Sequence, residues 1–374
     1  KVYTDEGITG IGESGDWGFL ESSGEVIKSF REYLIGQDPL RIEHHWQYMY
    51  RFSHFRGAAV MGAISALDEA LYDIAGKFYG VPVYRLLGGK CRDKVRVYNH
   101  TAGRTEEELI ENAIKGKEEG FTALGHLNPY LDEPRNQPFH DNNTQMLYNA
   151  ERRIARVREA VGEDTDLCLE LHRRLEPGLA VQLSARLEPY APMFLEDPIR
   201  PDNFDEMARV AQQCQIPIAT GERINSLFEF EMLLERGACS YVRASIGVCG
   251  GFTGIKKIAA LAEAHHKSLV PHNPLSPVTT NALLQFCAAT DNIAICEYPD
   301  PYAASTADHL TGSGSKLRQV DMVTQIPKFE KGYVEIPEGP GLGIDLISDV
   351  EDRFPFRPHA VGTRLNLDGS ICDQ

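Results

Sequence analysis

Three glutamates, each closing a short apolar run, recur at equal intervals in the middle of the chain. Glu170 ends the run LCLE, Glu196 ends MFLE, and Glu222 ends IPIATGE. Each interval holds a polar turn and a stretch long enough for one helix, which is the repeat of a strand–helix unit in a parallel barrel. Since the carboxyl ends of barrel strands meet on one face, we expect the three carboxylates to point at a common centre.

Carboxylates that converge in this way need a cation. Unpaired, they would repel one another and resist ionisation. A hard divalent ion removes the conflict, and a set of oxygen ligands alone favours Mg²⁺. We therefore predict a magnesium site formed by Glu170, Glu196 and Glu222. Acidic residues also end strands and cap helices without binding metal, but the equal spacing makes that interpretation the weaker one.

The same period continues on both sides of the glutamates. Downstream, apolar runs end at Arg243 with Ser245, at His272 and at Glu297, while upstream residues 94–99 begin the barrel and are followed by His100. Helical patterns alternate with the strands at 105–119, 145–161, 176–188, 203–214, 226–236, 252–266 and 278–290. We predict an α/β fold, a modified (β/α)8 TIM barrel of the form (β/α)7β.

Length and pattern also divide the chain of 374 residues, which is long enough for a barrel and a smaller domain. Residues 1–92 predict an α+β capping domain, including a long Ala- and Leu-rich helix at 57–79. Residues 93–325 form the barrel, and residues 326–374, with Gly-Pro turns and short strands, are expected to pack back on the capping domain. Because the sequence opens inside a strand-like segment, we expect a first strand and its loop to precede residue 1.

The net charge limits the possible binding partners, and the cysteine pattern indicates the cellular compartment. With 38 Lys and Arg against 54 Asp and Glu, the formal net charge is −16, which argues against nucleic acid and anionic membrane surfaces. The eight cysteines include no CxxC pair, so neither a zinc ribbon nor a disulfide framework is predicted, and a reducing cytoplasm fits best. No apolar stretch reaches membrane-spanning length.

Two histidines are candidates for proton transfer. His172 follows Glu170 by two residues, and alternate residues of a strand share a face, so both can point into the site. His272 ends another strand. Histidines on different strands with a metal between them suit removal of a proton on one side and protonation of a leaving group on another. We interpret His126, His265 and His266 as structural, and Arg173 as either steering an anionic substrate or forming a salt bridge.

Several motifs then indicate a family. The chain resembles the mandelate racemase subgroup of the enolase superfamily over essentially its whole length, in TDEGITGIGE, ALDEALYDIAGK with PVYRLLGG, FLEDPIRPDN, CGGFTG and CEYP. Within this subgroup it is most similar to mannonate- and galactonate-type acid-sugar dehydratases, in VYNHTAG, ELHRRLEP, GERINS, YVRASI and LSPVT.

The resemblance implies roles for the residues already singled out. It implies that the three glutamates bind Mg²⁺, that His172 is the general acid, and that the substrate site is lined by His100, Arg243, His272 and Glu297. The shared chemistry is removal of a proton α to a carboxylate, with the metal stabilising the resulting charge. It also implies a homo-oligomer, either a tetramer or an octamer.

At several positions the sequence departs from the family pattern. The first metal ligand is usually Asp, where this chain has Glu170. Racemases carry a Lys base on the second strand, and mannonate dehydratases an Arg with a Tyr from the next loop; here Gly125 stands near that position and Tyr130 is the nearest Tyr. Galactonate-type enzymes pair a seventh-strand His with an Asp, whose place Ser245 takes. The best candidate for the base is His272.

These features favour a Mg²⁺-dependent dehydratase of a hexonate or pentonate, for example of the mannonate, gluconate or galactonate type, that forms a 2-keto-3-deoxy acid. One alternative is a racemase or epimerase of a 2-hydroxy acid, which needs bases on both faces of the α-carbon. Another is a barrel that binds metal and an acid sugar with little catalysis. The loop at 127–143 is expected to contribute to the choice of sugar.

Overall fold

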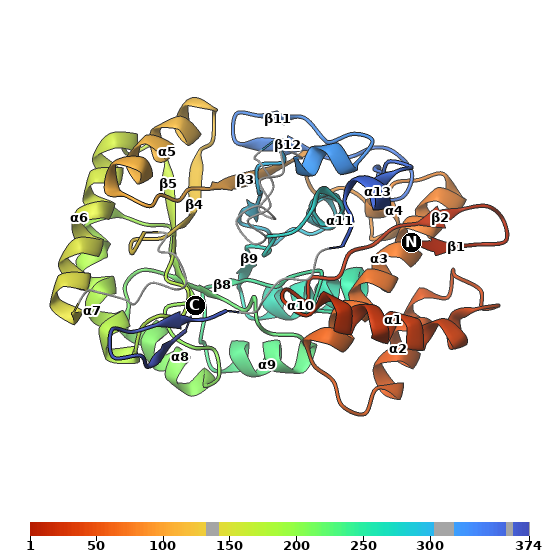
Figure 1. Cartoon of the computed structure of the whole chain (residues 1–374), viewed down its shortest axis with the longest axis horizontal. Helices are drawn as coiled ribbons and strands as arrows, with labels where there is room; N and C mark the ends of the chain where they lie inside the picture. The colour runs from red at the N-terminus through yellow and green to blue at the C-terminus, as the bar shows by residue number, and fades with distance from the viewer. Residues whose placement is uncertain (132–141, 303–317, 357–361, 374) are drawn as a thin grey trace.

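The structure is a computed structural model that describes residues 1–131, 142–302, 318–356 and 362–373. Its centre is a barrel of parallel strands, each paired with the next in chain order (Figure 1). The barrel closes where β10 pairs with β3 and where the amide of Ala294 donates to Leu269 O on the neighbouring strand. The strands are β3 (Lys94–His100), β4 (Ala123–Leu127), β5 (Asp166–Glu170), β6 (Phe194–Glu196), β7 (Ile218–Thr220), β8 (Tyr241–Val242), β9 (Ser268–Leu269) and β10 (Cys296–Glu297).

One helix follows each strand from β3 to β9, so the prediction of a (β/α)7β barrel is confirmed. The helices are α5 (Glu106–Glu118), α6 (Asn143–Val161), α7 (Pro177–Leu187), α8 (Phe204–Gln213), α9 (Leu227–Glu235), α10 (Gly251–Ala264) and α11 (Pro277–Ala288). Side-chain caps fix several of their starts. At α5 the Thr105 hydroxyl accepts from the Glu108 amide at 3.1 Å, and Asn142 and Ser226 form capping boxes at α6 and α9.

The inside of the barrel is filled by a layer of apolar side chains that includes Tyr98, Cys168 and Phe194. Alternate residues of a strand share a face. The residue two positions after Cys168 is Glu170, and the residue two positions after Phe194 is Glu196. Both glutamates are therefore directed into the barrel mouth directly above this apolar layer, and the layer forms the floor of the site.

The capping domain contains a short hairpin and helices packed around one long helix. The hairpin is β1 (Val2–Tyr3) with β2 (Thr9–Gly10), and the helices are α1 (Leu20–Leu34), α2 (Ile42–Phe52), α3 (Ala58–Tyr79) and α4 (Val83–Leu86). The predicted helix at 57–79 is α3, which ends at Gly80 in the left-handed conformation.

Acidic residues of this domain join it to the barrel. The Asp68 carboxylate on α3 accepts from the Thr253 amide at 3.0 Å and from the Thr253 hydroxyl at 2.7 Å, at the start of α10. The Glu13 carboxylate accepts from the hydroxyl groups of Ser276 (2.6 Å) and Thr279 (2.7 Å), at the start of α11. In both places a carboxylate satisfies free donors at a helix N-terminus, which holds the capping domain over the barrel.

The C-terminal part of the chain contacts both units. β11 (Phe329–Glu330) and β12 (Tyr333–Glu335) extend the barrel sheet, since β12 pairs with β3. Further on, the amide of Leu342 donates to Asp73 on α3 at 2.8 Å. The final hairpin lies against the barrel through an ion pair of Asp373 with Arg223 at 3.1 Å. The remaining elements are η1 (Glu188–Tyr190), η2 (Gln319–Met322), α13 (Val350–Arg353), β13 (Arg364–Leu365) and β14 (Ile371–Cys372).

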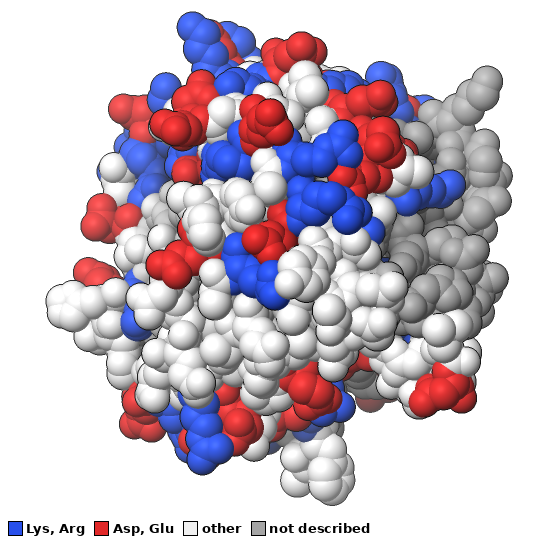
Figure 2. Space-filling view, turned by 90° about the vertical axis from the view of Figure 1, so that its left-hand side faces the viewer, with Lys and Arg blue, Asp and Glu red and all other residues white. Residues whose placement is uncertain are grey.

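The outer surface on the side of α5 and α6 carries charges of both signs. Figure 2 shows Lys and Arg interspersed with Asp and Glu there. Pairs such as Arg152 of α6 with Glu106 of α5, 3.0 Å apart, link neighbouring helices. Within the ranges that the structure describes, no helix combines the length and the apolar character needed to cross a membrane.

Candidate active site

The three glutamates meet at the C-terminal mouth of the barrel, as their spacing predicts. Glu170 and Glu196 end neighbouring strands in matching register, and Glu222 lies just beyond the end of β7. One carboxylate oxygen from each comes within 4.8 Å of the others. This separation allows all three oxygens to bind one small cation.

Burial creates an electrostatic conflict in this cluster. It raises the pKa of Glu170 well above the ordinary value, and the charges of Glu196 and Glu222 add to the effect. Burial also raises the pKa of Glu196 to about 8. For Glu222 burial acts in the same direction, but Arg173 and His272 hold its pKa below the usual range. A divalent cation would stabilise all three carboxylates, so these residues fit Mg²⁺.

Arg173 is a salt-bridged residue rather than a solvent-exposed one. Its guanidinium is buried, pairs with Asp197 at 3.0 Å, and contacts Glu222. Of the two roles left open by the sequence, the salt bridge is the one seen. The side chain supplies positive charge beside the carboxylate cluster.

Arg243 forms ion pairs with Glu196, a member of the carboxylate cluster, and with Glu297. Its side chain is buried, with Nε 2.6 Å from Glu196 Oε1 and Nη2 2.7 Å from Glu297 Oε2. Glu297 also contacts His100, whose Nε2 lies 2.7 Å from Oε1. Although burial opposes ionisation, Arg243 and His100 hold the pKa of Glu297 well below its usual range. Two strands remote in sequence are thereby joined by a continuous charged network.

His172 lies beside Glu170, but not because the two residues share a face of one strand. β5 ends at Glu170, and both His172 (φ 55) and Arg173 (φ 65) have left-handed backbone conformations. The His172 amide donates to Glu170 Oε1 at 2.7 Å, which fixes this turn beside the metal-ligand candidate. Burial, with Arg173 next in effect, lowers the pKa of the imidazole well below the ordinary value.

His272 lies just beyond the end of β9 and contacts the carboxylate cluster. Its Nε2 lies 3.3 Å from Glu222 Oε2, and burial lowers the pKa of its imidazole. Its Nδ1 is buried and has no hydrogen-bond partner in the described part of the chain. Ser245, which takes the place of the Asp that pairs with this His in galactonate-type enzymes, therefore does not hydrogen-bond to Nδ1.

His126, which we interpreted as structural, lies in the same cluster. Its ring centroid is 4.9 Å from that of His100 in a stacked arrangement and 5.5 Å from that of His172 in an edge-on arrangement. Burial lowers the pKa of the imidazole to about 4, and His100 adds to the effect. A glycine inside a strand pattern, here Gly125, is a known signal for a bulge that redirects its neighbour, and it could have identified His126.

The loop after β4 contributes a further aromatic residue. Tyr130 is buried, and the guanidinium carbon of Arg174 lies 5.4 Å from its ring centroid. The part of this loop at 132–141, expected to contribute to the choice of sugar, lies outside the described residues.

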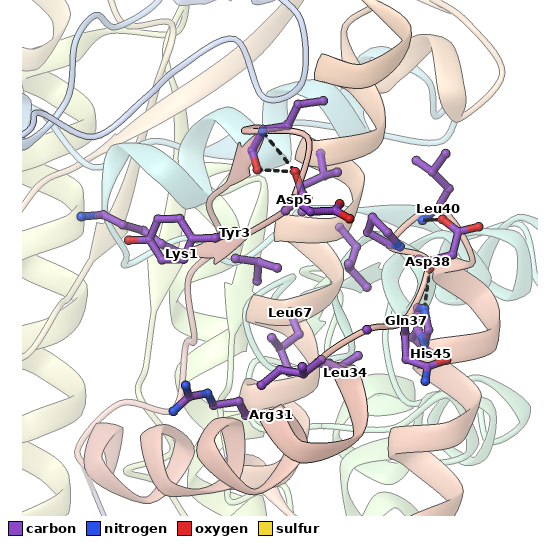
Figure 3. A pocket seen from close by; sticks show the side chains of 18 of the residues that line it. Lys1, Tyr3, Asp5, Arg31, Leu34, Gln37, Asp38, Leu40, His45 and Leu67 are labelled. Carbon is purple, nitrogen blue, oxygen red and sulfur yellow. Dashed lines mark hydrogen bonds between the residues drawn. The ribbon is translucent and has the colours of Figure 1, made fainter.

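A separate cavity of ≈ 1050 Å³ lies in the capping domain, between the hairpin, α1 and the start of α2 (Figure 3). Its lining mixes apolar side chains such as Leu34 and Leu67 with charged ones such as Arg31. None of the residues expected to carry chemistry is among those that line it. The candidate active site remains the carboxylate and imidazole cluster at the barrel mouth.

Comparison with known proteins places this geometry in a family. Residues 1–88 match the N-terminal domain of mandelate racemase / muconate lactonizing enzyme, and residues 135–350 match the enolase C-terminal domain-like family. The chain belongs to the mandelate racemase/muconate lactonizing enzyme family. The predicted resemblance is thus confirmed.

Among curated relatives in this family, D-galactonate dehydratase from Ralstonia pickettii (strain 12J) is 37% identical over 349 residues, covering 92% of this chain and 87% of the relative. D-galactonate dehydratase from Klebsiella pneumoniae (strain 342) is 35% identical over 360 residues, covering 93% and 88%. The prediction of an enzyme of the hydro-lyase class is confirmed by these relatives.

Solved structures of the family have the same fold as this chain. An enolase from Agrobacterium radiobacter, a galactarate dehydratase candidate with Na and L-malate bound, has a TM-score of 0.89 at 30% identity, covering 100% of this chain and 94% of that chain. A member of the enolase superfamily from Salmonella Typhimurium has a TM-score of 0.83 at 30% identity, covering 94% and 93%.

Proposed function

We propose that the protein is a Mg²⁺-dependent dehydratase that converts a hexonate or pentonate into a 2-keto-3-deoxy acid. The observation that carries the proposal is the meeting of three buried carboxylates with several imidazole rings at one barrel mouth. Relatives named D-galactonate dehydratase, at 35–37% identity, support this class of substrate and make D-galactonate the first acid to test.

The reaction can be written with the residues present. Mg²⁺, held by Glu170, Glu196 and Glu222, would stabilise the negative charge that develops on the substrate carboxylate when C2 loses its proton. A histidine takes that proton, for which the sequence predicts His272. His172 then donates a proton to the C3 hydroxyl, which leaves as water while a C2–C3 double bond forms. The resulting enol becomes the 2-keto-3-deoxy acid by taking up a proton at C3.

The other proposed site residues bind and position. His100 keeps a partly exposed edge beside Glu297, so it can donate to substrate while Glu297 fixes its ring. The guanidinium of Arg243 donates hydrogen bonds to Glu196, to Glu297 and to backbone carbonyls. We propose that it acts on substrate by orienting these neighbours and by adding positive charge to a chain whose net charge is −16.

A screen of hexonates and pentonates for 2-keto-3-deoxy acid formation, with and without Mg²⁺, tests the proposal. We expect turnover with at least one acid and its loss on chelation. Glu170→Gln should abolish turnover, whereas Glu163→Gln, at an exposed position, should not. Inversion at C2 without loss of water would identify a racemase or epimerase instead. Metal and acid binding without any turnover would identify a binding barrel.

Two further parts of the proposal concern the whole protein. We propose that it is a cytoplasmic enzyme of acid-sugar metabolism and that it forms a tetramer or octamer. Light scattering of the purified protein gives the oligomeric state directly, and a monomeric mass would contradict this part.

A further inference from the structure

We propose that His126, rather than His272, takes the proton from C2 of the substrate. This inference rests on the proposed dehydration and assigns one of its steps to a residue at the end of β4.

The backbone around His126 is arranged to turn its ring into the site. In the ladder between β4 and β5, Leu124 pairs with Leu167 but Leu127 pairs with Leu169, so β4 carries an extra residue in a bulge. His126 has a left-handed conformation with φ 48, which costs free energy for any residue with a side chain. Left-handed residues of this kind concentrate at functional sites.

The cause of the bulge is the floor of the barrel. A Cβ at Gly125 would lie 2.0 Å from the ring of Tyr98, so the inward position of β4 at this level has no room for a side chain. The next residue, His126, therefore supplies the side chain that β4 presents at the mouth. A bulge is a regular way to redirect a side chain beside an active site.

The neighbours of the ring suit proton transfer. His126 lies between His100 and His172, at centroid distances of 4.9 Å and 5.5 Å. Neither ring nitrogen of His126 has a hydrogen-bond partner among the described residues, so one nitrogen can accept a proton. The residue is half-buried, so after the reaction the proton can pass to solvent at the barrel mouth.

His272 is less well placed for the same step. Its Nε2 is occupied by Glu222 at 3.3 Å, and its Nδ1 is buried without a partner within the described ranges. If Nε2 donates to Glu222, the basic nitrogen is Nδ1, which is buried and has no hydrogen-bond partner to orient it toward C2. The contact with Glu222 instead suits a residue that positions a metal ligand.

The step balances without any added reactant. The C2–H bond breaks, its electron pair is delocalised into the substrate carboxylate, and the proton forms a bond to a ring nitrogen of His126. The C3–O bond then breaks as the C2–C3 double bond forms, and the hydroxyl leaves as water with a proton from His172. His126 returns its proton to solvent.

The test measures deuterium uptake at C2 by NMR, with the 3-deoxy analogue of the best substrate found in the screen. This probe keeps the C2 proton but has no leaving group, so only proton removal is observed. His126→Asn is the variant, because Asn tolerates the left-handed backbone. His266→Asn is the matched control, since His266 also has a left-handed backbone (φ 52) but is exposed at the end of α10.

We expect exchange to fall by roughly 100-fold or more in His126→Asn, the usual range for a lost general base, and to stay at the wild-type rate in His266→Asn. In His126→Gly, which suits the same backbone and leaves a ring-sized space, added imidazole should restore exchange. Wild-type exchange in His126→Asn, or no rescue of a folded His126→Gly, would overturn the inference and leave the dehydratase proposal intact. If the wild-type enzyme dehydrates none of the acids, the proposed function itself is overturned.

Discussion

Arg243 and Glu297 form a buried ion pair, with Nη2 of the arginine 2.7 Å from Oε2 of the glutamate. The same guanidinium reaches Glu196 through Nε at 2.6 Å, so one cation serves a metal-ligand candidate on β6 and a carboxylate on β10. Neither carboxylate is exposed to solvent that could replace it. The charge balance of the site is therefore built into the core of the barrel.

Removing this cation should be costly. We expect Arg243→Gln to destabilise the protein by about 3–5 kcal/mol, because it leaves the buried carboxylates of Glu196 and Glu297 without the guanidinium that pairs with both. The control is Arg209→Gln, which breaks an exposed pair with Glu206 and should cost at most about 1 kcal/mol. Urea unfolding of both variants measures the difference. Equal losses would show that burial does not govern the strength of these pairs.

The carboxylate cluster predicts stabilisation by metal. The proposed Mg²⁺ site exists only in the folded state, so Mg²⁺ at a hundredfold excess over its Kd should stabilise the protein by about 2.7 kcal/mol. The expected result is a rise in Tm with Mg²⁺ for the wild type and a much smaller rise for Glu222→Gln. A variant that keeps the full rise would show that Glu222 is not a ligand.

Gly125 is predicted to be required by packing. In Gly125→Ala the added Cβ meets the Tyr98 ring, which is fully buried and held by the barrel interior, and overpacking of this kind costs about 1–3 kcal/mol. Gly178→Ala in α7 is the control, because a Cβ there meets nothing within 4 Å and should be neutral or stabilising. Denaturant unfolding compares the two. No loss in Gly125→Ala would mean that the barrel floor can rearrange.

The barrel and the glutamate cluster could be predicted from sequence because both depend on local periodicity. Each strand–helix unit repeats at a similar length, and the parallel arrangement then brings strand ends together whatever lies between them. The predicted strand at 94–99 and helix at 57–79 match β3 and α3 closely for the same reason.

The position of His126 could not be predicted by the same reasoning. It depends on the bulge in β4, and a shift of one residue in a strand exchanges its two faces. The bulge in turn depends on Tyr98, a ring from the neighbouring strand, so the contact is not local. The ion-pair partners of Arg243 could not be predicted from sequence for the same reason, since Glu196 and Glu297 come together only after the barrel closes.

Asp68 predicts how stability depends on pH. Burial raises the pKa of its carboxyl to about 7, although hydrogen bonds from Thr253 act in the opposite direction. An acid whose pKa is raised by folding binds its proton more tightly in the native state, so its contribution to stability is greatest below the unfolded pKa, about 3.9, and is lost as the pH rises to about 7.

The matched variant is Asp68→Asn, which keeps the shape of the side chain but cannot ionise. Relative to this variant, the wild-type protein should lose stability between about pH 4 and pH 7, by at most about 4 kcal/mol, and the difference should then stay constant at higher pH. Urea unfolding of both proteins from pH 5 to pH 9 covers most of this change and its end. A difference that does not vary over this range would mean that Asp68 is already ionised in the folded protein at pH 5, with its charge stabilised by the Thr253 donors at the start of α10.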